Sequence, residues 1–228
     1  MNPSLNYEFT PHTRKTFRIV ECENCGHQFC NPMPNLESGY KETVDLTYLL
    51  TKEQRFKTAR SSIKILEKYL DRGSSLLDVG CNAGYFWDVA SEKFDVEGIE
   101  LSNWSAELAA VNHLVHRVPL STLQIDSKYD GITLFGVIEH FHDPRLEIAS
   151  AFQALTPGGF LFIYTGDRTA FLPRLPKKKW WWYQGMHLQY FSKSSLRKLL
   201  EQTGFTYVDS RRFPLFFSLN SLASSMNR

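Results

Sequence analysis

The feature that most constrains this chain is an apolar run followed by a short segment with two glycines, Gly80 and Gly84. It reads Leu76-Leu-Asp-Val-Gly-Cys-Asn-Ala-Gly-Tyr, and a helical pattern follows from residue 85. Gly80 lets the chain turn sharply out of a strand, and Gly84 allows the close approach of a ligand or of the helix. The first helical turn presents backbone amides that can hold a polar ligand. The run therefore predicts a small-molecule crevice at the end of a strand.

Short apolar runs and helical segments alternate along the rest of the chain. Phe56, Ile63 and Leu70 share one face of a helix that we expect to run until Gly73. The further expected strands cover residues 76–79, 96–101, 115–118, 131–135, 160–164 and a stretch from about 205, and the further expected helices cover residues 85–93, 104–112, 144–155 and 194–203. This alternation predicts an α/β fold with a parallel, doubly wound sheet.

Length and charge narrow the class of protein. The chain has 228 residues, of which 43% are hydrophobic, so it can bury one sizeable core. Lysine plus arginine total 26 and aspartate plus glutamate total 24, which argues against a dedicated nucleic-acid binder. The N-terminus lacks a signal-peptide pattern and no apolar run approaches the roughly 18 residues of a membrane span, so we expect a cytoplasmic protein without a transmembrane segment.

The glycine run resembles motif I of class I methyltransferases that use S-adenosylmethionine (SAM). Asp78 precedes Gly80 by two residues, and the acidic-x-Gly-x-Gly-x-Gly pattern of that motif is followed except at Asn82. A dinucleotide fingerprint fits less well, because Asn82 and Tyr85 occupy its second and third glycine positions.

Three later segments, residues 129–144, 155–160 and 187–192, resemble the fourth-strand, fifth-strand and post-fifth-strand signatures of the branch that includes ubiquinone and small-molecule methylators. The resemblance implies a Rossmann-like, mostly parallel sheet of seven strands. The C-terminal run from Phe213 is expected to supply its antiparallel hairpin strand. Residues 51–228 would form this SAM-binding domain, and residues 1–50 an N-terminal appendage.

Glu100 is the first candidate for a cofactor ligand. It ends a strand 20 residues after Gly80, where such folds bind ribose hydroxyls. Trp104 is a candidate neighbour of the adenine, with a core or surface aromatic as the alternative. Members of the family often carry an acidic residue after the third strand, whereas residues 118–122 contain none. The implied cofactor site comprises Asp78, Gly80, Cys81, Asn82, Gly84, Glu100, Leu101 and Glu139, with S-adenosylhomocysteine (SAH) as the product.

Methyl transfer from a sulfonium needs mainly in-line alignment and the exclusion of solvent. A hydroxyl acceptor would be helped by a general base, and neutral histidine suits that role. His140, His187 and Tyr190 are the candidate catalytic residues, with His142 as a further candidate. An insertion near residues 168–190, which carries the run Lys177-Lys-Lys-Trp-Trp-Trp-Tyr, is expected to form an acceptor lid.

The acceptor itself stays open between several classes. A small molecule such as a sugar, a quinone or a lipid-linked metabolite is favoured. The segment Gly136-Val-Ile-Glu lacks the signature typical of many enzymes that methylate base amino groups. An RNA methyltransferase and a non-catalytic SAM-binding or scaffold protein remain alternatives. The oligomeric state is not specified by the sequence.

A cysteine cluster in the appendage suggests a metal. The run Cys22-Glu-Asn-Cys25-Gly-His27 resembles one knuckle of a zinc ribbon, but tetrahedral zinc needs four ligands. Cys30, His27 or His12 could complete the site. Zinc at Cys22 and Cys25 is accordingly a further hypothesis.

Overall fold

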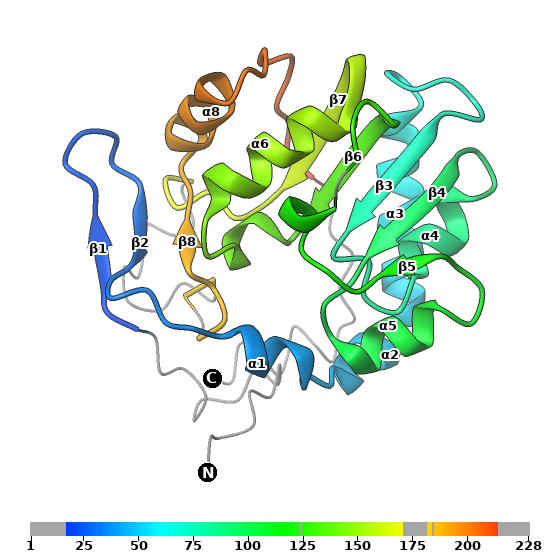
Figure 1. Ribbon diagram of the computed structural model, residues 1–228, viewed down its shortest axis with the longest axis horizontal. Helices are drawn as coiled ribbons and strands as arrows, with labels where there is room; N and C mark the ends of the chain where they lie inside the picture. The colour runs from blue at the N-terminus through cyan, green and yellow to red at the C-terminus, as the bar shows by residue number, and fades with distance from the viewer. Residues whose placement is uncertain (1–16, 124, 171–181, 184, 214–228) are drawn as a thin grey trace.

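Two sheets organise the chain in the computed structural model, which describes residues 17–123, 125–170, 182–183 and 185–213 (Figure 1). Five parallel strands form the larger sheet in the order β5-β4-β3-β6-β7, and a small antiparallel sheet has the order β1-β2-β8. The strands are β1 (Ile19–Glu21), β2 (Gln28–Cys30), β3 (Ser75–Val79), β4 (Asp95–Ile99), β5 (Val115–His116), β6 (Tyr129–Phe135), β7 (Leu155–Tyr164) and β8 (Gln189–Tyr190).

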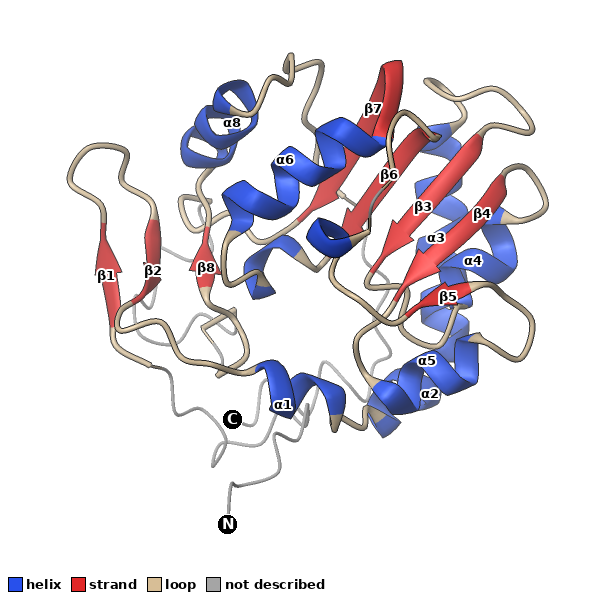
Figure 2. Cartoon of the chain, in the orientation of Figure 1, coloured by secondary structure: helices blue, strands red, loops and turns tan. Residues whose placement is uncertain are grey.

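Helices cover both faces of the larger sheet (Figure 2). They are α1 (Glu37–Lys41), α2 (Leu46–Leu50), α3 (Lys52–Leu66), α4 (Tyr85–Ala90), α5 (Asn103–Ala109), α6 (Pro144–Ala154) and α8 (Lys193–Gln202), with 3-10 turns η2 (Leu120–Thr122) and η3 (Ile138–His140). Neighbouring residues of β3 point to opposite faces, as the pleat requires. Leu76 packs with Trp87 of α4, and Leu77 packs with Ile148 of α6. The predicted Rossmann-like, doubly wound α/β fold is confirmed.

The strand count differs from the seven expected. Residues 205–213 form no strand, and the ring of Tyr207 lies instead under Lys193 and Arg197 of α8. The expected C-terminal hairpin strand falls largely on residues outside the described part of the chain. The first long helix also ends earlier than predicted, at Leu66, because the backbone tightens into i→i−3 turns immediately afterwards.

The N-terminal segment is joined to the larger domain through the small sheet. Gln28 of β2 pairs with Tyr190 of β8, so the β1–β2 hairpin lies beside the segment that follows β7. From there the chain runs through α1 toward the carboxyl ends of β3 and β4 (Figure 1). Within the described residues, none of the helices has the length and apolar character needed to cross a bilayer.

Candidate functional site

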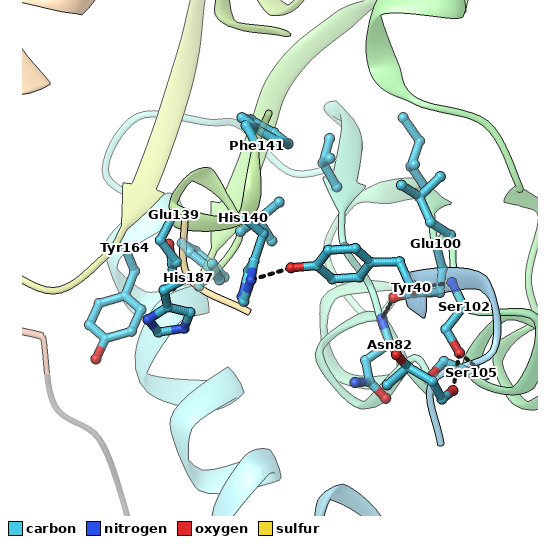
Figure 3. Close-up of a pocket in the computed structure, with 18 of the residues that line it drawn as sticks. Tyr40, Asn82, Glu100, Ser102, Ser105, Glu139, His140, Phe141, Tyr164 and His187 are labelled. Atoms are coloured by element: carbon cyan, nitrogen blue, oxygen red, sulfur yellow. Dashed lines mark hydrogen bonds between the residues drawn. The ribbon is translucent and has the colours of Figure 1, made fainter. Parts of the chain in front are cut away.

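A cavity of about 790 Å³ opens at the carboxyl ends of β3, β4 and β6 (Figure 3). Ligands of open α/β sheets bind at this edge, at the point where the strand order reverses. Here the reversal lies between β3 and β6, because β3 leads to β4 on one side and the chain later returns to its other side. Gly80, Asn82, Glu100, Leu101 and Glu139, all predicted from the sequence, line this cavity.

The glycine turn forms the floor of the cavity. Gly80 has φ 75°, and its N–H and that of Cys81 donate to the carbonyl oxygen of Ile99 at 2.8 and 3.0 Å. Asn82 has φ 48°, in the left-handed region that glycine usually occupies. Its Oδ1 accepts from the N–H of Ala83 at 2.8 Å. Asparagine therefore fits where the methyltransferase motif has a glycine, because a short polar side chain tolerates this conformation.

Glu100 presents its carboxylate beside this turn. Its Oε2 accepts from the backbone N–H of Asn82 at 2.9 Å, and its Oε1 accepts from that of Ser102 at 2.7 Å. Burial raises the pKa of this carboxyl, whereas the backbone amides that bond to it oppose the rise. Each carboxylate oxygen can accept a second hydrogen bond. The main chain thus fixes the orientation of this carboxylate at the cavity wall.

Three predicted cofactor residues lie behind the cavity wall. Asp78 is buried, and its Oδ1 accepts from Oγ1 of Thr133 at 2.7 Å. Burial raises the pKa of Asp78 to about 7, against the effect of the Thr133 hydrogen bond. Cys81 is buried against Gly98, and Gly84, with φ 81°, packs against His113. These residues shape the turn, and they are not among the cavity-lining residues.

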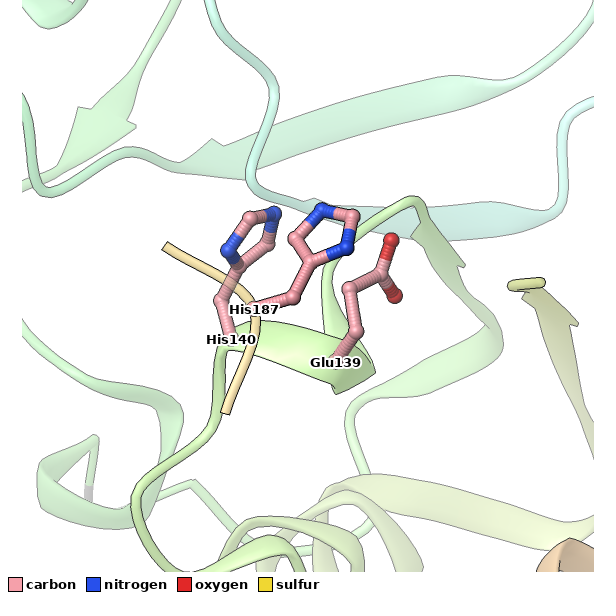
Figure 4. Close-up of side chains that lie close together, drawn as sticks. All are labelled: Glu139, His140 and His187. Carbon is pink, nitrogen blue, oxygen red and sulfur yellow. The ribbon is translucent and has the colours of Figure 1, made fainter. Parts of the chain in front are cut away.

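Glu139, His140 and His187 come together at the other end of the cavity (Figure 4). Glu139 is buried, its Oε2 accepts from Oγ1 of Thr165 at 2.9 Å, and burial raises its pKa to about 7. The two imidazole rings are 4.7 Å apart in an edge-on arrangement. Burial lowers the pKa of His140 to about 4 and that of His187 well below 6.5, so both rings are neutral at pH 7.

Backbone carbonyls hold the rings of both histidines. Nδ1 of His140 is 2.8 Å from the carbonyl oxygen of Met186, and Nδ1 of His187 is 2.7 Å from that of Trp182. Because a carbonyl oxygen only accepts, Nδ1 of His187 donates to Trp182. The His140 ring is held by the backbone carbonyls of Met186 and Gly136 and by the hydroxyl of Tyr40.

Two further predicted residues lie outside the cavity lining. Tyr190 is fully buried in a cluster with Cys30, Trp182 and Leu188, and it donates to the carbonyl oxygen of His187 at 2.8 Å. The structure therefore puts its hydroxyl on the main chain rather than toward an acceptor. Trp104 is likewise absent from the cavity wall, whereas His142 contributes to it.

The sequence patterns did not predict the contribution of the N-terminal segment. The hydroxyl of Tyr40 in α1 is 2.5 Å from Nδ1 of His140 and donates to the carbonyl oxygen of Met186 at 3.0 Å. Oγ of Ser102 donates to the carbonyl oxygen of Thr43 at 2.8 Å. These contacts hold residues 34–45 across the cavity, and no motif in this irregular segment signals them.

Helix α3 supplies another unpredicted wall. Its lining residues are Arg55, Thr58, Ala59 and Ser62, which follow the i, i+3, i+4, i+7 spacing of one helical face. In the sequence, this spacing of small and polar residues beside the apolar face of the helix is the pattern from which the wall could have been predicted. Arg55 is the single lysine or arginine among the described residues of the cavity wall.

The zinc hypothesis gains no support from the described residues. His27 donates through Nε2 to Oε1 of Gln189 at 2.9 Å, and the Cys30 thiol is directed to the carbonyl oxygen of His187 at 3.6 Å. Among the described residues, no group of three metal-ligating side chains includes Cys22 or Cys25. His12, and residues 177–181 of the expected lid, lie outside the described part of the chain, whereas Trp182 lines the cavity.

Comparisons with known proteins identify the family. Residues 51–210 match the methyltransferase domain family. The ubiquinone biosynthesis O-methyltransferase of Chromobacterium violaceum is 26% identical over 134 residues, which cover 52% of this chain and 58% of that protein. The chain spans about half the length of the curated relatives it matches.

Solved structures agree with the family match. A SAM-dependent methyltransferase of Archaeoglobus fulgidus has a TM-score of 0.59 at 16% identity, covering 71% of this chain and 75% of that structure. A possible histamine N-methyltransferase of Thermotoga maritima has a TM-score of 0.57 at 23% identity, with the same coverage. Both share the fold. The chain therefore belongs to the methyltransferase domain family and has the class I fold of SAM-dependent methyltransferases.

Proposed function

We propose that this protein binds SAM in the cavity and transfers its methyl group to a small-molecule acceptor. The observation that carries the proposal is the continuity of the cavity, which extends from the Glu100 carboxylate to His140 and His187. A volume of about 790 Å³ is within the range of cavities that bind small molecules and cofactors. One end would hold the nucleoside and the other end the acceptor.

The residues at the first end fit the cofactor. The ribose diol would donate to the Glu100 carboxylate, whose orientation is fixed by two backbone amides. Leu101 and Leu120 provide apolar surface on either side for the adenine. The carboxylates that line the cavity, which are Asp45, Glu100, Glu139, Asp143 and Glu147, face a single arginine, and this excess of negative charge favours a cationic sulfonium.

At the second end the wall is aromatic and suits an acceptor with an apolar or aromatic body. Tyr40, Phe141, Tyr164 and Trp182 line this part of the cavity around the two histidines. We place the acceptor hydroxyl beside His140 and His187. The similarity to ubiquinone biosynthesis O-methyltransferases supports an oxygen acceptor. In the transfer step the acceptor hydroxyl releases its proton to solvent, its oxygen forms a bond to the methyl carbon, the carbon–sulfur bond breaks, and neutral SAH is released.

An acceptor screen tests this function. Purified protein would be incubated with methyl-labelled SAM and panels of phenols, catechols, sugars and short RNAs, with label transfer and SAH formation as readouts. Transfer to a small hydroxyl compound, reduced at least tenfold in Glu100→Gln, is the expected result. SAM binding without transfer to any panel would favour a scaffold role, and salt-sensitive transfer to RNA would favour the RNA alternative.

A further inference from the structure

Glu139, His140 and His187 have a property that the proposed methyl transfer does not require. One carboxylate oxygen and one nitrogen from each ring lie within 4.8 Å of one another. Two imidazoles and one carboxylate form a ligand set that binds divalent transition metals and leaves coordination positions open. We propose that these three side chains bind a divalent transition-metal ion at the acceptor end of the cavity.

The hydrogen bonds around the cluster match those of metal-ligating histidines. Such histidines almost always donate their second ring N–H to a carbonyl or carboxylate, which fixes the tautomer and the ring orientation. His140 and His187 both donate through Nδ1 to backbone carbonyl oxygens, those of Met186 and Trp182. Each ring places one nitrogen in the cluster. Figure 4 shows the two rings and the Glu139 carboxyl group gathered in one place.

The carboxylate of the cluster is also held from behind. Oγ1 of Thr165 donates to Oε2 of Glu139 at 2.9 Å, which orients the carboxyl group. A divalent cation would also compensate the burial of the Glu139 charge.

The local backbone explains why these residues meet. Glu139 and His140 are adjacent in η3, directly after β6, and His187 directly precedes the segment that leads into β8. The N–H of Leu188 donates to the carbonyl oxygen of Glu139 at 2.8 Å, so the two segments are tied together at the cluster itself. Zinc–nitrogen bonds of about 2.0–2.1 Å imply ligand atoms about 3.3 Å apart. A modest inward movement of the side chains would thus complete the set.

A metal ion here would face the aromatic end of the cavity, where it could bind the acceptor hydroxyl. This role rests on the proposed function, whereas metal binding itself does not. The bound hydroxyl would lose its proton to solvent more readily, and its oxygen would then attack the methyl carbon of SAM.

Cobalt absorption tests the site directly. Chelator-treated full-length protein would be titrated with Co²⁺, which reports its ligands through its visible spectrum, and then with Zn²⁺ in competition. We expect one equivalent of Co²⁺ with visible bands of nitrogen and oxygen ligation. His187→Gln and Glu139→Gln should weaken binding more than tenfold, and Thr165→Val, which keeps all three ligands, about tenfold.

Two controls separate this site from the alternatives. His142→Gln changes a cavity histidine outside the cluster, and Cys22→Ser/Cys25→Ser removes the thiol pair; both should leave Co²⁺ binding unchanged. Sulfur-to-cobalt charge transfer, or binding lost only in the cysteine variant, would overturn the proposal. So would wild-type protein that binds no Co²⁺. Circular dichroism and SAM titration of each variant report folding, and Thr165→Val decides the matter if a ligand variant fails to fold.

The same samples distinguish this proposal from the proposed function. If metal-free protein binds SAM but no Co²⁺, the metal-site proposal is wrong and the methyltransferase proposal is unaffected. If the protein binds Co²⁺ at the cluster but no SAM, the methyltransferase proposal is wrong and the metal-site proposal is unaffected.

Discussion

Asp78 of β3 and Thr133 of β6 are joined by a buried hydrogen bond of 2.7 Å between neighbouring strands. The bond lies directly beneath the glycine turn, and Glu100 is close enough to raise the pKa of Asp78 further. The fold thus keeps a buried carboxyl group next to the glycine turn although burial disfavours its charge.

Asp78→Asn should stabilise the protein without SAM at neutral and alkaline pH. The folded-state pKa of Asp78 is about 7, against 3.8 in its ordinary state, so wild-type stability falls as pH rises from about 4 to 7. Asparagine keeps an acceptor for Thr133 and carries no charge. In urea unfolding, the free energy of unfolding of Asp78→Asn should exceed that of the wild type by on the order of 3 kcal/mol at pH 8, and this difference should disappear near pH 4. An advantage independent of pH would contradict the raised pKa.

The contribution of Glu97 of β4 to stability should have the opposite pH dependence. Although its partial burial acts to raise the pKa, hydrogen bonds from His116, Lys128 and Tyr129 lower it to about 2. Glu97→Gln should therefore destabilise the protein by about 2 kcal/mol above pH 4.5. The stabilisation by the carboxylate is lost as pH falls toward 2, so the free energies of unfolding of wild type and Glu97→Gln, measured by urea unfolding, should become equal there. As a control, SAM affinity at pH 7 should be the same for both proteins.

Asn82 allows a test of the turn conformation. Asn82→Ala should lower the free energy of unfolding by about 1 kcal/mol, because alanine is disfavoured at φ 48° and the N–H of Ala83 loses its acceptor. Asn82→Gly restores the motif residue and should be no less stable than Asn82→Ala. Denaturant unfolding of both variants measures this. Equal stability of wild type and Asn82→Ala would show that the left-handed conformation is not required.

Tyr40→Phe should loosen the N-terminal segment over the cavity. The variant loses the hydroxyl contacts to His140 and to the carbonyl of Met186, at a cost of about 1 kcal/mol. Hydrogen exchange of residues 37–43 should then accelerate about fivefold. Tyr69→Phe serves as the control, because it removes a tyrosine hydroxyl that contacts Arg211 outside the cavity lining. Equal exchange of residues 37–43 in both variants would argue against a closing role for Tyr40.

Local patterns were sufficient to predict the larger sheet and the end of the cavity formed by the glycine turn and Glu100. The strand that carries Leu76 and Leu77, the glycine turn and Glu100 are adjacent in sequence, so their spacing reports their geometry. The last strand, expected from about residue 205, was predicted from a short apolar run alone. Residues 205–213 instead turn Tyr207 toward cations of α8, a tertiary contact that strand propensity cannot report.

The remaining site residues depend on contacts between distant segments. Tyr40 reaches His140 across 100 positions of sequence, and the pairing of Glu139 with His187 requires the segment after β7 to fold back on η3. Tyr190 follows His187 by three residues, yet its side chain is buried and does not line the cavity. Sequence proximity to a site residue therefore does not specify which side of the cavity wall a side chain occupies.

Calorimetric titration of wild type and Glu100→Gln with SAM and SAH tests the central claim most directly. Glutamine keeps one acceptor and puts an N–H₂ group where the second carboxylate oxygen accepts from the main chain. We predict micromolar SAM binding to the wild type, weakened about 10- to 150-fold in Glu100→Gln and unchanged in Glu107→Gln on α5. Folded wild-type protein that binds neither SAM nor SAH, or a Glu100→Gln variant with undiminished affinity, would contradict the account.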